Sequence, residues 1–335
     1  MPERQAGDVP PSPPPRSWLF IPGAAERFVA KLRTLEGSSA PDAVIFDLED
    51  GVATGDLAAA RERVGEIAAA PGGVPWLPAT VAVRTHGVTH PAFAEDLATL
   101  GPGVSTLMLP KVGSAQEVER AAELLLEADH AHVGTVAIIE SALGLEQVAA
   151  IAGSGVQGLA FGAEDFAADL GLAPWSLSGQ VDSELAAGRQ AVLDAARARI
   201  VTAAASAGLV WRIDTPTLQI GQGDGQVDSR GGRVEAEARR SRAMGFSGKF
   251  AIHPRHVVPL HRGFEPSPGE VAWARAVLAS EASNAASDQQ GASLTAGQMV
   301  DEAVFRQARA ILALRCVDPG FEVEATAADG GGDAG

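Results

Sequence analysis

The chain has 335 residues, of which 46% are hydrophobic and 20% are charged, and its formal net charge is −16. This length suits one barrel of about 250 residues with an appendage. The acidic excess argues against nucleic acid as a partner. The single cysteine, Cys316, excludes an internal disulfide and a cysteine-based metal site. No run of 18 apolar residues predicts a membrane span, and no signal peptide is recognised, so a cytoplasmic protein is expected.

Composition divides the chain into four expected segments. They are a proline-rich disordered arm, a barrel, a helical lid or subunit-contact segment, and a disordered Ala/Gly/Asp tail: residues 1–15, 16–262, 263–320 and 321–335. Within the third segment, helical patterns at 267–279 and 299–314 flank a polar stretch at 283–296 that is expected to be a loop.

Short apolar runs alternate with helical patterns along most of the chain. The eight predicted strands lie at residues 18–21, 43–46, 80–83, 106–109, 136–140, 159–165, 209–213 and 249–252. The helical patterns lie at 24–35, 57–69, 91–100, 114–128, 143–152, 183–207 and 233–244. Eight strands followed by helices predict a (β/α)8 TIM barrel with a C-terminal helical lid. A doubly wound sheet is the alternative, but no glycine-rich phosphate loop follows the first strand.

Two neighbouring apolar runs end in carboxylates, at Glu140 and Asp165. In a barrel of parallel strands, the carboxyl ends of all strands meet at one rim, where the active site lies. The pair offers only oxygen ligands, with no His or Cys nearby in sequence. Oxygen sites with few protein ligands favour Mg²⁺, which keeps open positions for substrate oxygens, and Mn²⁺ could substitute.

Other charged side chains follow the remaining strands: Asp47, Glu49, Asp50, Arg84, Lys111, Asp214 and His253. A strand-end Asp often caps the next helix, and this structural interpretation is kept for Asp214 and His253. Arg84 has a planar fork that suits a carboxylate or a developing oxyanion. Together with a divalent ion, it indicates a bound 2-oxo acid and aldol cleavage or condensation. A Schiff base on Lys111 or Lys249 is the alternative aldolase route.

Several motifs in order resemble the citrate lyase β-subunit-like proteins of the HpcH/HpaI aldolase superfamily. The resemblance runs from about Arg16 to Ala313 and rests on 16–23 (RSWLFIPG), 45–52 (IFDLEDGV), 109–112 (LPKV), 139–144 (IESALG), 161–166 (FGAEDF), 198–201 (ARIV), 245–249 (GFSGK) and 252–254 (IHP). It implies a Mg²⁺-binding barrel that acts on a short 3-hydroxyacyl-CoA. It also implies a homo-oligomer, a trimer or hexamer.

The resemblance also assigns roles to individual residues. It implies metal ligation by Glu140 and Asp165, keto-acid binding by Arg84, and a polar network behind the metal that contains Asp47 and Asp50. Gly162, Ala163 and Glu164 would line the substrate site. Asp301 would transfer the proton to the acyl-CoA carbon from a neighbouring subunit.

Two positions depart from the family pattern. His86 stands where the family usually has Asn, and residues 215–224 lack the usual aromatic and acidic run. The preferred hypothesis is a lyase that interconverts malyl-CoA, citramalyl-CoA or a related thioester with acetyl- or propionyl-CoA and glyoxylate or pyruvate. The alternatives are an acyl-CoA thioesterase, a citrate-lyase-type β subunit that acts on a carrier thioester, and a non-catalytic barrel that binds a keto acid.

Overall fold

A computed structural model describes residues 13–69, 74–174, 183–218, 228–286, 293–295 and 298–314. Residues 14–264 form one compact unit, and the chain from residue 265 onward belongs to a second. The structure does not describe residues 1–12 of the predicted arm, the predicted tail at 321–335 or Cys316.

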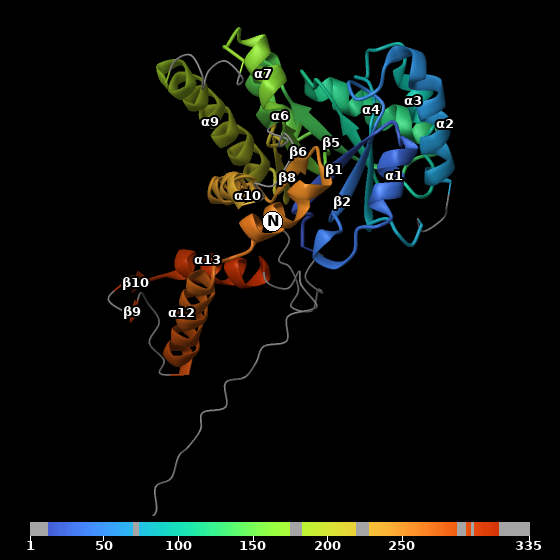
Figure 1. Ribbon diagram of the computed structural model, residues 1–335. Coiled ribbons are helices and arrows are strands. Elements are labelled where there is room, and N and C mark those ends of the chain that lie inside the picture. Colours follow the sequence, from blue (N-terminus) through green and yellow to red (C-terminus); the bar gives the residue numbers. More distant parts are fainter. Residues whose placement is uncertain are drawn as a thin grey trace, which may run out of the picture. The chain divides into compact units, whose positions relative to one another are not determined.

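Eight parallel strands close into a barrel in which each strand pairs with the next in sequence and β8 pairs with β1 (Figure 1). The strands are β1 (Ser17–Pro22), β2 (Ala43–Asp47), β3 (Thr80–Arg84), β4 (Thr106–Leu109), β5 (Gly134–Ile139), β6 (Gly158–Phe161), β7 (Trp211–Asp214) and β8 (Gly248–Ala251). The predicted (β/α)8 barrel is therefore confirmed, and the doubly wound alternative is wrong because the sheet has no open edge.

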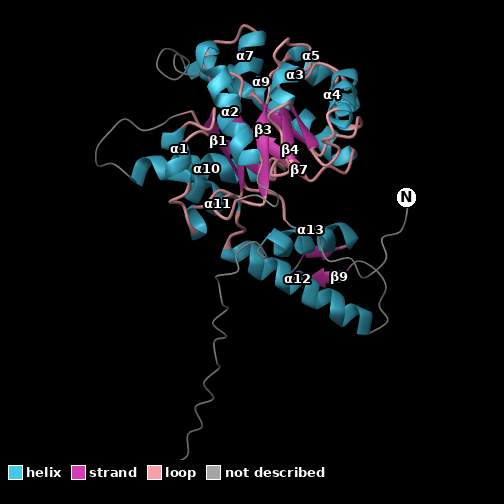
Figure 2. Cartoon of the chain, turned by 90° about the vertical axis from the view of Figure 1, so that its right-hand side faces the viewer, coloured by secondary structure: helices cyan, strands magenta, loops and turns pink. Residues whose placement is uncertain are grey.

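Helices cover the outside of the barrel, as Figure 2 shows. They are α1 (Glu26–Leu32), α2 (Leu57–Ala68), α3 (Phe93–Leu97), α4 (Ala115–Glu127), α5 (Ala142–Glu146), α6 (Val148–Ala152), α7 (Ala163–Asp169), α9 (Ser183–Ser206), α10 (Asp228–Ala243) and α11 (Val257–Phe264). Three-residue 3₁₀ turns lie at Gly37–Ser39, Thr54–Asp56 and Pro254–His256.

The strands alternate between two apolar layers. One set of side chains fills the barrel interior, and the other set packs under the helices. Along β2, for example, Ile45 belongs to the interior cluster while Val44 and Phe46 belong to the outer one. Because both faces of each strand are apolar, charged groups are concentrated where the strands end.

The second predicted carboxylate does not follow a strand directly. β6 ends at Phe161, and Asp165 lies in the first turn of α7. The apolar run continued past the strand because Ala163, Phe166 and Ala167 are also buried, and this spacing of three and four residues is that of a buried helical face. The sequence run at 159–165 therefore contains a strand end and a helix start.

The C-terminal unit has its own small core. Helices α12 (Pro268–Ala286) and α13 (Glu302–Ala313) accompany a two-stranded antiparallel sheet of β9 (Ser293–Thr295) and β10 (Gln298–Val300). The residues of this core are Ala274, Val277, Val300, Phe305 and Ala308. The predicted loop at 283–296 is wrong at both ends, and the predicted helix at 299–314 begins only after Asp301. None of the described helices is long and apolar enough to cross a membrane.

Candidate active site

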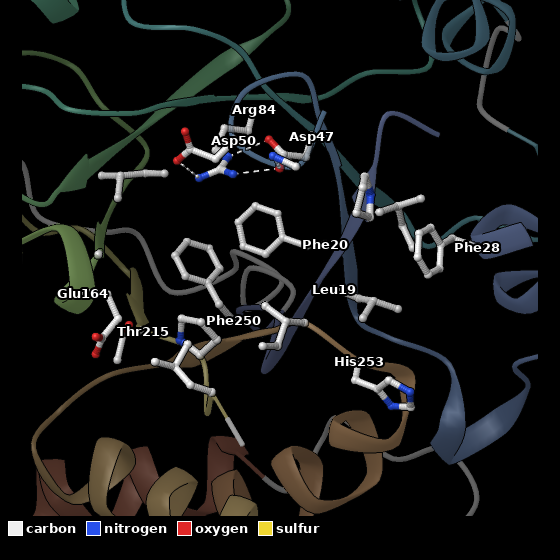
Figure 3. Close-up of a pocket in the computed structure, with 18 of the residues that line it drawn as sticks. Leu19, Phe20, Phe28, Asp47, Asp50, Arg84, Glu164, Thr215, Phe250 and His253 are labelled. Atoms are coloured by element: carbon white, nitrogen blue, oxygen red, sulfur yellow. Dashed lines mark hydrogen bonds and ion pairs between the residues drawn. The ribbon is translucent and has the colours of Figure 1, made fainter. Parts of the chain in front are cut away.

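A cavity of about 710 Å³ lies over the carboxyl ends of the strands. Its lining includes the predicted residues Asp47, Asp50, Arg84, Glu140, Gly162, Ala163, Glu164 and Asp165. Figure 3 shows the Arg84–Asp47 pair on one side of the cavity and His253 on another, with the rings of Phe20 and Phe250 between them. The structure thus brings together all the predicted site residues of the barrel.

Arg84 is held by a two-pronged ion pair. Its Nε and Nη2 both donate to Asp47, each at 2.7 Å, and its guanidinium carbon lies 4.9 Å from the centre of the Phe20 ring. Asp47 is 3% exposed and also accepts from Gly51 N at 2.9 Å. Burial alone would lower the pKa of Arg84, but Asp47 and two further carboxylates raise it, so the guanidinium stays charged. Its remaining terminal nitrogen, Nη1, faces Glu49 and Asp50 instead of Asp47.

Glu49 and Lys111 form the next layer of the cluster. Lys111 Nζ lies 2.6 Å from Glu49 Oε1 and 3.8 Å from Asp50 Oδ1. Glu49 Oε2 lies 3.1 Å from Arg84 Nη1 in an ion pair but has no hydrogen-bond partner among the described residues. Burial raises the pKa of Glu49 despite Arg84 and Lys111. The role given to Lys111 by the Schiff-base alternative conflicts with this ion pair, which holds the ammonium charged.

Glu140 is buried and precisely oriented. Lys111 N donates to its Oε1 at 2.7 Å, from a backbone with φ of 53°. Burial and the nearby charges of Asp165 and Glu49 together raise the pKa of Glu140 to about 8, although the Lys111 N–H and Arg84 lower it. A carboxylate in such surroundings needs a proton or a cation to neutralise it.

The donor set fits a hard divalent cation. Glu140 and Asp165 line the same cavity and repel each other, as the raised pKa of Glu140 shows. Over the part of the chain that the structure describes, no cluster of three or more His, Cys, Asp or Glu side chains could hold a metal. A cation here would therefore take most of its ligands from water or substrate, which is typical of Mg²⁺.

Glu164 has a partner that the sequence did not reveal. Arg189 of α9 lies 2.5 Å from Glu164 Oε1, and its Nε also donates to Ala173 O at 3.1 Å. Glu164 is therefore engaged by a buried cation on the cavity rim, although its side chain is 38% exposed. No sequence pattern links α7 with a residue nearly two turns into α9, so this contact could be found only in the fold.

Three other residues that the sequence pointed to, His86, Asp214 and His253, make hydrogen bonds that hold the fold together. His86 lies outside the cavity lining, where its Nδ1 is 2.7 Å from the buried Asp96. Asp214 accepts from Arg197 of α9 and from Ser241 of α10, behind the barrel wall, that is, between the strands and these two helices. This fits the structural role expected for it. His253 does line the cavity, and it also accepts from Arg255 N as a helix cap.

Part of the cavity wall consists of residues that no sequence pattern indicated. Lys31, Thr215, Phe20, Phe250 and Arg255 all line it. Burial lowers the pKa of His253, and the charges of Arg255 and Lys31 lower it further, so the three groups lie close enough to interact. The cavity therefore has an acidic end with Glu140 and Asp165 and a basic region of Lys31, His253 and Arg255, here called the basic rim.

Asp301 belongs to the C-terminal unit. It is the N-cap of α13, where its Oδ1 accepts from Val304 N at 3.1 Å. It is exposed. A proton-transfer role for this residue stays a prediction.

Comparisons with known proteins agree with these features. Residues 16–254 match the model of the HpcH/HpaI aldolase/citrate lyase family. The chain is 33% identical over 321 residues to an L-malyl-CoA/β-methylmalyl-CoA lyase of Cereibacter sphaeroides, which covers 91% of this chain and 95% of that protein. It is 34% identical to a citrate lyase subunit beta-like protein of Deinococcus radiodurans, over 89% and 96% of the two chains.

Among solved structures, the protein CitE of Mycobacterium tuberculosis is similar, in complex with magnesium, acetoacetate and coenzyme A. The match has a TM-score of 0.68 and 30% identity, and it covers 90% of this chain and 98% of that one. The predicted resemblance is confirmed: the chain belongs to the HpcH/HpaI aldolase/citrate lyase family, and its named relatives are lyases.

Proposed function

We propose that this protein is a Mg²⁺-dependent carbon–carbon lyase that cleaves or forms a short 3-hydroxyacyl-CoA, such as malyl-CoA or citramalyl-CoA. A 2-oxo acid would be the other product. The observation that carries the proposal is that one cavity is lined by an acidic cation site, by Arg84 and by the basic rim. Relatives named as malyl-CoA lyases and a similar structure with magnesium and coenzyme A support the same substrate class.

Glu140 and Asp165 would hold the cation. When bound, Mg²⁺ would act as a Lewis acid that stabilises negative charge on the oxygen of the 2-oxo acid. The Lys111 N–H donates to Glu140 at 2.7 Å and so fixes the direction of this side chain, and Gly162 leaves room for its carboxylate. Mn²⁺ prefers similar ligands and is expected to replace Mg²⁺.

Arg84 would bind the carboxylate of the 2-oxo acid half. The Asp47 pair fixes the guanidinium plane, so little rotational entropy is lost when the substrate binds. In cleavage, solvent water would take the proton of the substrate hydroxyl, and its oxygen would form the carbonyl of the 2-oxo acid. The electron pair of the breaking C–C bond would move onto the thioester as an enolate, whose carbon then takes up a proton. We assign this last proton to Asp301, supplied by a neighbouring subunit of a homo-oligomer.

The basic rim would bind the phosphates of coenzyme A. Lys31 and Arg255 are cationic groups on the cavity wall. Lys31 lies in the last turn of α1, and Arg255 lies in the 3₁₀ turn that follows β8. Phosphates attract such side chains strongly. Between the rim and the cation site, Phe20, Phe250 and Ile138 offer apolar contacts for the chain that joins the phosphates to the thioester.

A coupled assay of the purified protein tests this function. With Mg²⁺ and malyl-CoA or citramalyl-CoA, we expect release of glyoxylate or pyruvate, detected as a hydrazone, without release of free thiol. Asp165→Ala should lower kcat/KM more than roughly 100-fold through loss of a cation ligand. Asp169→Asn, on the same helix but bound to Ala142 N, should leave turnover nearly unchanged.

The alternatives give other results in the same assay. Free thiol without a 2-oxo acid would indicate a thioesterase. Turnover only with a carrier-protein thioester would indicate a citrate-lyase-type β subunit, which the names of some relatives keep in view. Unchanged turnover by Asp165→Ala would contradict the assigned cation site.

A further inference from the structure

The helix that carries Asp165, α7, has Gly162 as its N-cap, and the packing of Glu140 against this position requires a glycine there. A Cβ at position 162 would lie 2.3 Å from Glu140 Oε2 and 2.7 Å from Glu140 Cβ, so no larger residue fits. Helix N-caps are usually Ser, Thr, Asp or Asn, whose side chains accept from the first backbone N–H groups. Gly162 makes no such bond. The start of α7 therefore needs an acceptor from another element.

Thr215 supplies that acceptor. Ala163 N, the first N–H of α7, donates to Thr215 Oγ1 at 3.3 Å. Ala163 is 1% exposed and Thr215 is 8% exposed, so the bond lies at the buried edge of the cavity. Thr215 directly follows β7, while Ala163 comes two residues after the end of β6, and these strands are neighbours in the barrel. The bond thus spans two strand ends, and Figure 3 shows Thr215 beside Glu164 of the same turn.

Thr215 is itself held from behind the barrel. Its N–H donates to Asp214 Oδ1 at 2.9 Å. Asp214 is fixed by Arg197 Nε at 2.9 Å and by Ser241 Oγ at 2.5 Å. The backbone of Thr215 is consequently anchored to a buried cluster of hydrogen-bonded side chains.

We propose that Thr215 is a positioning residue for Asp165, acting through the N–H of Ala163. Asp165 stands two residues beyond this bond, so a relaxed first turn of α7 would move its carboxylate relative to Glu140. Loss of the hydroxyl would leave a buried N–H unpaired, which favours such relaxation. The inference rests on the proposed role of Asp165 as a cation ligand. Thr215 is also the first residue of the segment 215–224, where the sequence departs from the expected family pattern.

The experiment measures Mn²⁺ affinity by electron paramagnetic resonance, without keto acid or thioester. Thr215→Val keeps the shape but loses the hydroxyl, and we expect its affinity to fall roughly 10-fold or more, as for other groups that orient metal ligands. Thr215→Ser keeps the hydroxyl and should bind nearly as the unchanged protein does. Thr217→Val is the matched control, because buried Thr217 lies in the same segment but donates to Glu237 at 2.5 Å.

Each result decides the matter. Equal Mn²⁺ affinity of Thr215→Val and the unchanged protein would overturn the inference and leave the proposed function standing. An equal loss in Thr217→Val would also overturn it, because general disturbance of the segment would then be the cause. Absence of Mn²⁺ binding by the unchanged protein would overturn the cation site itself. If Thr215→Val does not fold, Thr215→Ser and Thr215→Ala replace it, since they differ only in the hydroxyl.

Discussion

Two clusters of charged residues in the barrel unit contain buried carboxylates, but the pKa values of these carboxyl groups shift in opposite directions. In the cavity cluster, Glu140 and Glu49 have raised pKa values. In the cluster behind the barrel, the pKa of the fully buried Asp214 is lowered: burial raises it, but Lys249, Arg197 and Ser241 outweigh burial. Glu237 behaves in the same way.

Charge balance explains this difference. The cavity cluster sets the carboxylates of Asp47, Glu49, Asp50, Glu140 and Asp165 against Arg84 and Lys111. Behind the barrel, Asp214 and Glu237 face Arg197 and Lys249, with Lys249 Nζ 3.6 Å from Asp214 and 4.0 Å from Glu237. A balanced cluster supports the fold, whereas a buried excess of negative charge is stable only with an added proton or cation. The imbalance therefore marks the functional site better than burial does.

The largest expected effect on stability comes from removing one charge of the balanced cluster, the one that contains Asp214 and Lys249. Lys249→Met should lower the free energy of unfolding by about 3 kcal/mol, because it leaves buried carboxylates with one cation fewer. Urea denaturation at pH 7 measures this loss. Lys31→Met is the matched control, and its stability should change by less than about 0.5 kcal/mol because Lys31 is exposed. A loss below about 1 kcal/mol in Lys249→Met would show that the cluster is not a balanced support.

The next effect concerns the cavity cluster and is opposite in sign. The pKa of Glu140 rises from about 4.3 in an unfolded chain to about 8 in the fold. The folded state thus binds the proton more tightly, and metal-free stability should fall as pH rises through this window. Glu140→Gln should remove about 2 kcal/mol of that decline, at the expense of cation binding.

Thermal unfolding between pH 5 and 9 measures this decline. Saturating Mg²⁺ should flatten the profile of the unchanged protein, because the cation replaces the proton. Parallel profiles for the metal-free protein and Glu140→Gln would indicate that Glu140 is not the group responsible.

The smallest effect comes from His256, which lies beside the balanced cluster. Burial lowers the pKa of His256 to about 4, and its Nδ1 has no hydrogen-bond partner within the described ranges. A lowered pKa in the fold means that stability is present above pH 6.5 and declines as pH falls toward 4. His256→Phe should remove about 1 kcal/mol of the decline between pH 6.5 and 5. Denaturant titrations at the two pH values, with exposed His132→Phe as control, would reveal whether the acid sensitivity has another source.

The sequence predicted the barrel well because its signals are local. Short apolar runs followed by helical patterns appear in the chain as they appear in the fold, and the strand-end residues Arg84 and Glu140 fall on the cavity wall as expected. Prediction failed where one local pattern blends into another, as between Phe161 and Asp165. It failed again in the C-terminal unit, where α12 continues to Ala286 and where β9 and β10 pair in place of the predicted loop and helix start.

The amino-acid sequence by itself determined the fold class, the acidic rim and the family, because periodicity, strand-end charges and ordered motifs need no knowledge of distances. Only the tertiary structure decided which charges compensate one another. Arg189 meets Glu164, Lys249 meets Asp214, and Thr215 meets Ala163, across separations of 25, 35 and 52 positions. Closure of the barrel creates these contacts, and no local pattern encodes them. The balance of charge that separates support from active site is therefore a property of the fold.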